Sequence, residues 1–488
     1  MRNYIFFFCF LLLYQTSTGQ FTFQLDIKDS LDQIPVQIFE SNTGDRYILN
    51  ELVGRRTVQD YHTRISTIDS EGKIITTNLY KDSIFQYSIE NIIPVEDNHY
   101  LGFGFQKKHF DSLADFTIVT MDERFIVTQE NCWPITMSDL SLIQVKYINN
   151  NYFVFGSGLD RSNNTFNICA FKLSSNLELL ESAIYLGAVK IAFDLLPGIS
   201  DNNMRLFVRG FSQQTNTPGQ ILLIDTSLNI IEIKGIPQSL HNAYDAKYFN
   251  TQTYLLSGKK IVWNSSPQDD NMAIMKMDLS DAVQDFNIYG AIDTIDNPGS
   301  YSSLDFLDTN NIYFGGTNNF DIATLWSGAI SWFVLNKLNS TLELQWQKFY
   351  GGDAYYNSWN LLATQDGGCL MAGTRYDYYT QNYERDVFLV KVNEDGLIVG
   401  TGDELPNISV QDAIVYPNPG NESFTIQSGP QINGALFELF DMNGALMLSA
   451  TLDERMKTIS TALLPRGTFP YRITFDNKTV GSGKWVKQ

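Results

Sequence analysis

The chain has 488 residues, 34 Lys and Arg against 54 Asp and Glu, and a formal net charge of −20 at pH 7. Hydrophobic residues make up 43% and aromatic residues 13% of the chain, which is ample apolar material for buried cores and excludes disorder along the whole length. The negative charge argues against nucleic acid and against an anionic membrane surface as partners, because both repel it. These values predict an acidic globular protein of two to four domains, at roughly 100–200 residues per domain.

The first nineteen residues have the three-part layout of a secretory signal peptide. A short positive start at residues 1–3 precedes an apolar run at residues 4–14, and small or polar residues follow up to Gly19. The run is too short to cross a bilayer about 30 Å thick, and no later segment reaches the length of a membrane helix. We therefore predict that residues 1–19 are removed and that the protein carries no transmembrane segment.

Removal of this segment leaves three cysteines, Cys132, Cys169 and Cys369. Three cysteines are too few for a disulfide framework, even in an exported protein of this length. We interpret all three as buried small apolar side chains, and the alternative is a single disulfide between Cys132 and Cys169.

Residues 34–400 repeat a pattern of about 50 residues. A hydrophobic run that ends in a short polar turn recurs seven times, with the turn residues 51 to 61 positions apart. These turn residues are Asp69, Asp122, Ser174, Asp225, Asp278, Asn339 and Asn393. Apolar runs closed by glycine recur in phase with them, at Gly104, Gly156, Gly210, Gly258, Gly316 and Gly373.

Each copy alternates apolar and polar residues with a period of two, as in residues 388–392, and no helical period persists. A unit of about 50 residues with three or four short strands is typical of one blade of a β-propeller. The fold predicted for residues 20–400 is therefore an all-β, seven-bladed β-propeller, and a solenoid is the alternative. The last copy, at residues 361–373 and 386–392, resembles the blades of propellers in exported Bacteroidota proteins.

The last copy is short of one strand. After Asn393 only residues 397–399 remain before the predicted linker at residues 401–407, whereas the preceding copy has the run 342–350 at this place. Residues 21–27 alternate and belong to no copy. We predict that this N-terminal strand pairs into the seventh blade and closes the ring, which hides strand edges that invite aggregation.

Residues 408–488 differ in composition from the rest of the chain. They contain 7 Lys and Arg and 7 Asp and Glu, so the excess negative charge lies in the residues before them. Short alternating segments separated by turn residues predict a small Ig-like β-sandwich here. Four motifs follow one another, at residues 416–426, 438–444, 464–473 and 483–488.

In order and spacing these motifs resemble the opening, the central hairpin, the penultimate element and the closing strand of the C-terminal sorting domain of the type IX secretion system. One departure is Pro470, which cannot donate a strand hydrogen bond and is tolerated only at an edge or a bulge. The residues assigned to the sorting signal are Tyr416, Pro417, Asn418, Pro419, Gly444, Gly467, Gly483, Lys484, Val486 and Lys487.

The resemblance implies passage across the inner membrane by the signal peptide and across the outer membrane by the type IX machinery, which is the implied partner. The protein is then secreted or attached to the outer cell surface, and the tail is often removed there. The residues themselves favour recognition of the terminal strand by edge addition to a partner.

Motifs for catalysis and for cofactors are missing. The four histidines do not have the spacing of a zinc site, and there is no phosphate-binding loop, nucleophile elbow or dinucleotide fingerprint. Asp and Asn cluster at residues 201–203, 269–271, 308–311 and 318–321, where their oxygens could bind calcium. We interpret these clusters as turns, in which Asp and Asn are common, and predict no cofactor and no catalytic residue.

Two classes of function remain for the propeller. We favour a binding domain that recognises a glycan or a protein in the manner of an adhesin, and the alternative is an extracellular hydrolase or lyase acting on polysaccharide. Carboxylates around a basic residue in the central channel would favour the enzyme, whereas an aromatic-lined rim would favour binding, because the fold itself supports both.

The loops that join the second strand to the third in each copy are predicted to form a binding face. Their lengths vary, which more often marks function than core, and they carry aromatic residues that suit contact with sugars or proteins. The connection entering the seventh copy should lie on the same face. The alternative is that the rings only cover blade edges. The candidate residues, all expected to be exposed, are Trp263, Trp326, Tyr355, Tyr356, Tyr376, Tyr378, Tyr379 and Tyr383.

Overall fold

The computed structural model describes residues 21–398 and 413–487, except for short segments within them. The segments left out are 42, 56–59, 82–84, 96–98, 109–112, 139, 161–164, 186–189, 199–202, 211–218, 238–239, 263–268, 292–293, 322–324, 326–327, 381, 417, 419, 429–433, 442–443, 455 and 476–477. The predicted signal peptide and linker, together with Trp263, Trp326, Pro417 and Pro419, therefore lie outside the described residues.

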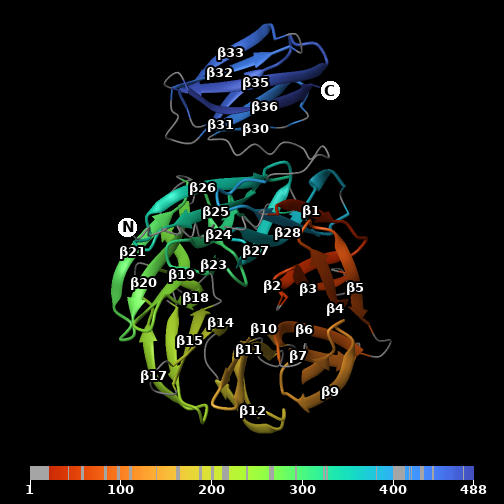
Figure 1. Cartoon of the computed structure of the whole chain (residues 1–488), viewed down its shortest axis with the longest axis vertical. Coiled ribbons are helices and arrows are strands. Elements are labelled where there is room, and N and C mark those ends of the chain that lie inside the picture. The colour runs from red at the N-terminus through yellow and green to blue at the C-terminus, as the bar shows by residue number, and fades with distance from the viewer. Residues whose placement is uncertain are drawn as a thin grey trace, which may run out of the picture.

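From β1 to β29 the described strands form seven antiparallel sheets, which Figure 1 shows as a ring around a common centre. The first two sheets consist of β2 (Asp32–Glu40), β3 (Arg46–Arg55), β4 (Asp60–Asp69) and β5 (Ile74–Tyr80), then β6 (Phe85–Pro94), β7 (Tyr100–Lys108), β8 (Asp115–Met121) and β9 (Val127–Pro134). The next two consist of β10 (Leu140–Ile148), β11 (Asn151–Asp160), β12 (Thr165–Ser174) and β13 (Leu179–Tyr185), then β14 (Lys190–Pro197), β15 (Met204–Gly210), β16 (Gln220–Ile224) and β17 (Ile230–Gly235).

The fifth sheet consists of β18 (Asn242–Tyr248), β19 (Thr253–Val262), β20 (Asp269–Asp278) and β21 (Val283–Tyr289). The sixth has β22 (Asn297–Pro298), β23 (Leu304–Asp305), β24 (Ile312–Asn318), β25 (Trp332–Leu338) and β26 (Leu344–Gly351). The seventh has β27 (Tyr355–Ala363), β28 (Cys369–Tyr376), β29 (Asp386–Val392) and, from the other end of the ring, β1 (Phe23–Ile27). This region is all-β and propeller-like, and its apolar cores lie between neighbouring sheets, as where Phe103 and Phe116 pack with Leu140 and Val154.

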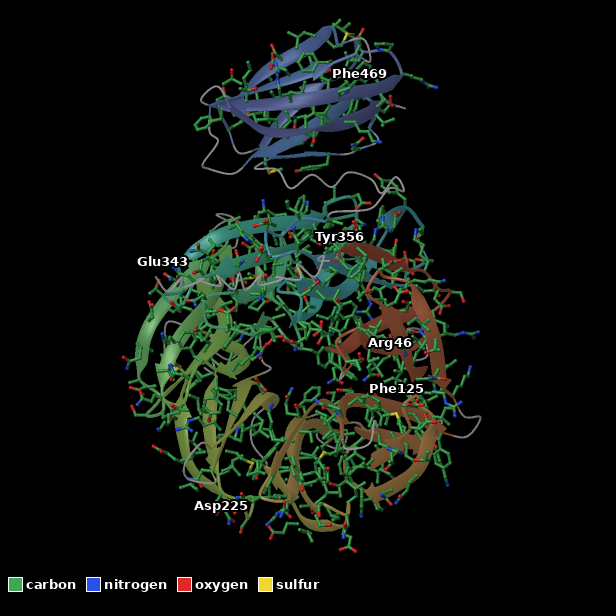
Figure 2. All side chains as sticks on the ribbon, viewed as in Figure 1. Arg46, Phe125, Asp225, Glu343, Tyr356 and Phe469 are labelled. Carbon is green, nitrogen blue, oxygen red and sulfur yellow. The ribbon has the colours of Figure 1, made fainter. Side chains whose placement is uncertain are left out.

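The predicted turn residues lie at the end of β4, β8, β12, β16, β20, β25 and β29 or directly after it, and their side chains explain why the turns recur. Asp225 (Figure 2) accepts the N–H groups of Ser227 and Asn229 at 2.9 and 2.8 Å through Oδ1. Such a side chain replaces the strand hydrogen bonds that the chain loses in the turn. The third residue after each turn residue has positive φ, and at Phe125 and Leu228 it is a buried apolar side chain.

The N-terminal strand closes the ring, as predicted. β1 pairs antiparallel with β29, in a register that places Phe23 opposite Lys391 and Ile27 opposite Val387. Phe23 is buried against Tyr47 of the first sheet, with ring centroids 5.9 Å apart. The first and last parts of the ring are therefore held by main-chain hydrogen bonds as well as by packing.

A belt of side-chain hydrogen bonds joins the inner strands of neighbouring sheets. Six of these strands have a register shift, and the residue that follows each shift is polar. A bulge of this kind turns a side chain away from its own ladder. The bonds connect Gln37 with Ile92, Asn91 with Ile143, Asp194 with Ala246, Asp245 with Leu304, Asp305 with Ala363 and Asn360 with Pro35.

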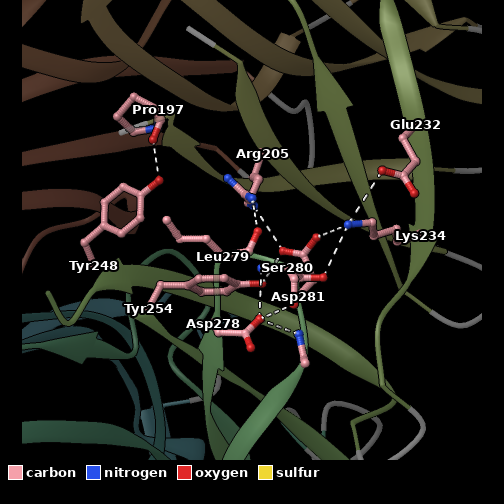
Figure 3. A network of polar contacts seen from close by, with 11 residues as sticks. Pro197, Arg205, Glu232, Lys234, Tyr248, Tyr254, Asp278, Leu279, Ser280 and Asp281 are labelled. Carbon is pink, nitrogen blue, oxygen red and sulfur yellow. Dashed lines mark hydrogen bonds and ion pairs between the residues drawn. The ribbon is translucent and has the colours of Figure 1, made fainter. Parts of the chain in front are cut away.

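The junction between the fourth and fifth sheets contains ion pairs (Figure 3). Asp281 occupies the positive-φ position that Leu228 holds in the preceding turn. Its carboxylate accepts hydrogen bonds from Arg205 Nε at 3.0 Å, from Lys234 Nζ at 2.6 Å and from the Tyr254 hydroxyl at 2.9 Å. The side chains of Arg205 and Asp281 are nearly buried, so loss of either would leave a buried charge without its partner.

The tail forms two sheets around one apolar core. One sheet contains β30 (Ala413–Tyr416), β31 (Ser423–Ser428) and β34 (Met456–Ser460), and the other β33 (Leu446–Leu452), β32 (Ala435–Phe440), β35 (Gly467–Phe475) and β36 (Lys478–Lys487). Phe424 packs against Phe437, Phe469 (Figure 2) and Trp485 between them. Pro470 lies just beyond the last residue of β35 that pairs with β32, Tyr471, so its missing N–H costs no bond on that side.

Two further expectations concern the cysteines and membrane-spanning helices. Cys132, Cys169 and Cys369 are all free, so the alternative of a Cys132–Cys169 disulfide is wrong. Burial raises the pKa of Cys169 to about 12, as suits a thiol that acts as an apolar side chain. Among the described residues there is no helix with the length and apolar character needed to span a membrane.

Candidate functional site

The first and last motifs of the tail meet in space although 66 residues separate them. Asn418 Nδ2 donates to the carbonyl of Lys484 at 2.6 Å, and Asn418 Oδ1 accepts the N–H of Val486 at 2.9 Å. The N–H of Gly420 then donates to the carbonyl of Val486 at 2.8 Å. The opening motif therefore binds the terminal strand β36 along its outer edge, like a short additional strand.

The penultimate motif joins this arrangement through a turn at residues 461–464. Thr461 donates from its N–H to the carbonyl of Glu422 at 2.8 Å and from its hydroxyl to that of Asn421 at 2.7 Å. From the other side, Lys487 Nζ donates to the carbonyls of Thr461 and Leu464 at 2.5 and 2.8 Å. Three of the four motifs are thus linked by hydrogen bonds at one end of the sandwich.

The remaining predicted sorting residues have structural roles near this end. Leu439 pairs with Tyr471, so the turn at Gly444 lies at the end of the sheet where Gly467 begins β35. Gly483 lies against the Tyr471 ring, because a Cβ at this position would be 2.7 Å from the Tyr471 hydroxyl. The Tyr416 ring meets Trp332 of β25 edge-on, with centroids 6.0 Å apart.

The converging motifs border a groove of about 760 Å³. It is lined by Asn421, Glu422, Ser423, Thr458, Ser460, Ala462 and Lys487. The strand β36 is at the edge of its sheet, but Asn418 and Gly420 occupy its outward-facing groups at Lys484 and Val486. Edge addition to a partner at these residues would require displacement of the opening motif. The sequence did not indicate that this motif covers the edge of β36.

On the ring, the predicted aromatic face is only partly exposed. Tyr355, Tyr356 and Tyr376 are between 1% and 3% exposed, so the expectation of exposed rings is wrong for these three. Tyr355 begins β27 and Tyr376 ends β28, where the two pair with each other, so both belong to strands and pack in the core. Tyr356 (Figure 2) packs against Phe388, with ring centroids 5.0 Å apart.

Three of the predicted rings are exposed between β28 and β29, on residues 377–380 and 382–385, which we call the tyrosine loop. Tyr378, Tyr379 and Tyr383 are 38%, 86% and 57% exposed. A 3-10 turn at Tyr378–Thr380 is held by Asp377, which accepts the N–H of Tyr379 through Oδ1 at 3.0 Å and that of Thr380 through its carbonyl at 3.0 Å. The Tyr378 and Tyr379 rings meet edge-on, so these two rings hold each other in a defined orientation.

A cluster of ion pairs around Arg375 includes Asp377, the first residue of the tyrosine loop. Arg375 of β28 donates to Asp353 Oδ2 at 3.1 Å and to the Tyr356 hydroxyl at 3.1 Å, and its guanidinium lies 3.8 Å from both Asp26 and Asp377. These carboxylates come from β1, from the connection before β27 and from the loop after β28. Sequence reasoning missed this cluster because its members are up to 351 positions apart in the chain.

Carboxylates of the inner strands also meet basic side chains, since Asp305 of β23 pairs with Lys247 of β18 and Asp32 of β2 pairs with Arg385. Asp245 and Asp194 are hydrogen-bonded to each other, and Asp245 also accepts bonds from Ser302, Ser303 and Leu304. Within the described part of the chain, no group of three or more His, Cys, Asp or Glu side chains could hold a metal ion. Asp308 accepts the N–H of Asn310 at 2.8 Å, as in a turn.

The tail belongs to a known family of domains. Residues 414–488 match the secretion system C-terminal sorting domain, so the tail is a type IX sorting domain, as its motifs predicted. A domain of this family implies secretion or export to the cell surface. No curated protein is significantly similar in sequence to this chain.

Several solved structures resemble the chain at low sequence identity. Hydrazine synthase of Kuenenia stuttgartiensis is 11% identical over 74% of this chain and 95% of its own, with a TM-score of 0.43. The propeller of Dos1 is 9% identical over 76% of this chain and 94% of its own, with a TM-score of 0.43. An oligogalacturonate lyase in complex with manganese is 8% identical over 77% of this chain and 99% of its own, with a TM-score of 0.44.

Proposed function

We propose that the protein is exported through the type IX secretion system and that its ring is a seven-bladed β-propeller that binds a glycan or a protein outside the cell. In this proposal residues 1–19 are the signal peptide, residues 20–400 the propeller, and residues 408–488 an Ig-like sandwich that carries the sorting signal. Each of the seven sheets is one blade, and the pairing of β1 with β29 supports this assignment because it completes the last blade.

The observation that carries the binding function is the tyrosine loop. Three tyrosine rings stand exposed on a short loop in which Asp377 holds the turn at Tyr378–Thr380 and Asn382 accepts the hydroxyl of Thr380. Tyrosine offers a large, rigid contact surface with a polar tip and loses little conformational entropy on binding. The buried rings of Tyr355 and Tyr376 support the loop from below rather than contact a ligand.

The test is a glycan and protein array probed with the mature chain, residues 20–488, and with the variant Tyr379→Ala/Tyr383→Ala. Both side chains are mainly exposed, so the variant should keep the melting temperature of the wild type. We expect a ligand that the wild type binds and the variant loses. A ligand that both proteins bind with equal affinity would place the binding site elsewhere.

A hydrolase or lyase acting on polysaccharide is the second candidate, and one group favours it. Burial raises the pKa of Asp386 to about 6, and the charge of Asp26 adds to the shift. A carboxyl group whose pKa is raised toward neutral pH beside a second carboxylate suits general acid catalysis in mildly acidic solution. Release of reducing ends from a polysaccharide panel by the wild type, lost in Asp386→Asn, would replace the binding function by the enzymatic one.

A further inference from the structure

We propose that the tyrosine loop binds a lysine- or arginine-rich segment of a partner polypeptide. The inference rests on the binding function proposed above and names the chemistry of the ligand. Its two grounds are the exposed rings of Tyr379 and Tyr383 and the negative charge around Arg375, next to Asp377 at the start of the loop.

The charge around the loop is negative. Asp26, Asp353, Asp377 and Asp386 surround Arg375, and Lys28 lies 3.4 Å from Asp26. Four carboxylates thus face two cations. Arg375 is largely covered, whereas Asp353 is about half exposed and Asp377 about one third exposed. Lys28 is about two thirds exposed, so an incoming ligand meets one cation, two partly exposed carboxylates and the tyrosine rings, and the carboxylates outnumber the cations.

Tyrosine rings and carboxylates suit the same ligand group. A guanidinium or ammonium over the face of a tyrosine gains about 0.5–1 kcal/mol at exposed sites, and an exposed ion pair adds about 0.2–1 kcal/mol. The long side chains of Lys and Arg can reach past an exposed ring to a partly covered carboxylate. An amino sugar carries its ammonium directly on the ring, whereas Lys and Arg carry their charge at the end of a flexible stem that can pass an exposed ring. A basic polypeptide therefore fits better than an amino sugar.

The experiment is calorimetric titration of the mature chain with synthetic heptalysine, with hexameric chitosan and cellohexaose in parallel. The variant Asp353→Asn/Asp377→Asn removes two charges and keeps one acceptor oxygen on each side chain. The control Glu394→Gln/Asp395→Asn removes the same number of charges at the turn after β29, at the opposite end of the same sheet. Melting temperatures verify the folding of each variant, and Asp353→Asn alone serves if the double variant melts early.

We expect heptalysine to bind and high salt to weaken it. Asp353→Asn/Asp377→Asn should weaken binding roughly three- to tenfold, Tyr379→Ala/Tyr383→Ala by a similar factor, and the control by less than about twofold. Equal effects of the test and control charge variants would overturn the inference, because net charge alone would then explain binding. Tighter binding of chitosan or cellohexaose than of heptalysine would overturn it too.

The two proposals fail separately. If Tyr379→Ala/Tyr383→Ala loses a neutral ligand found on the array while heptalysine does not bind, the binding function stands and the cationic ligand is wrong. If the variant loses neither an array ligand nor heptalysine, the tyrosine loop is not a binding site, and both proposals fall.

Discussion

Replacement of Asp245 by Asn should change how the stability of the ring depends on pH. Asp245 Oδ2 accepts hydrogen bonds from the Ser302 hydroxyl and from the N–H groups of Ser303 and Leu304, at 2.9, 2.9 and 3.0 Å. Burial raises the pKa of Asp245 to about 8, and the charge of Asp194 adds to the shift. At neutral pH the side chain is therefore protonated in the folded protein and ionised in the unfolded chain.

The magnitude follows from proton linkage. Because the pKa of this acid is raised on folding, its contribution to stability is largest below the unfolded pKa of about 4 and is lost as the pH rises through the folded value. Over this window the free energy of unfolding falls by about 1.4 kcal/mol per pH unit, and from pH 6 to pH 8 by about 2 kcal/mol in total. An Asn at position 245 stays neutral, keeps an oxygen for the three donors and offers N–H groups to Asp194, so this loss should disappear.

The assay is urea unfolding of the wild type and of Asp245→Asn at pH 6, 7 and 8, with Asp395→Asn, in an exposed turn, as the control. The free energy of unfolding of Asp245→Asn should gain about 2 kcal/mol on the wild type between pH 6 and pH 8. The control should follow the wild type. Parallel profiles of Asp245→Asn and wild type would refute the reasoning, because the folded protein would then hold no extra proton at this site.

Other contacts of the ring and tail can be tested in the same way. Deletion of residues 21–27 should lower the melting temperature of the ring, because β29 becomes an open edge; an unchanged melting curve would contradict the closing role of β1. Arg205→Met should cost about 3–5 kcal/mol in urea unfolding, because Asp281 stays buried without its main partner, and the added change Asp281→Leu should recover much of the loss. Asn418→Ala should speed hydrogen exchange at the Val486 amide, which loses its acceptor. Unchanged exchange at this amide would contradict the binding of β36 by the opening motif.

The sequence alone predicted the features of the ring that repeat. The turn residues were predictable because Asp, Asn and Ser side chains supply the acceptors that each turn needs, as Asp225 shows. The closing strand at residues 21–27 was predictable because one copy lacked a strand and one alternating segment had no place. Both conclusions need only local pattern and counting.

Exposure at the rim was not predictable in the same way. Loop lengths placed Tyr355 and Tyr376 in loops, but both are strand residues that pair with each other and face a core. Whether a ring beside a turn points to solvent depends on where the strand ends, and a shift of one or two residues reverses the answer. The cluster around Arg375 depends on segments far apart in the chain, whose meeting no local pattern indicates.

In the tail, the motifs were recognisable from sequence, whereas their contacts were not. Order and spacing identified the four motifs, and the match over residues 414–488 confirms the family. The bonds of Asn418 to β36 and of Lys487 to the turn at Thr461 join segments that only the folded sandwich brings together. These bonds bring residues from both ends of the domain together in space.

The central claim is that this tail directs export, and the most direct measurement is the location of a chain without it. Full-length protein and a deletion of residues 408–488 are expressed in a cell with a type IX system, and each is quantified in the periplasm, on the surface and in the medium. The account predicts full-length protein at the surface or in the medium and the truncated, folded ring retained in the periplasm. Equal amounts of both proteins outside the outer membrane would contradict it.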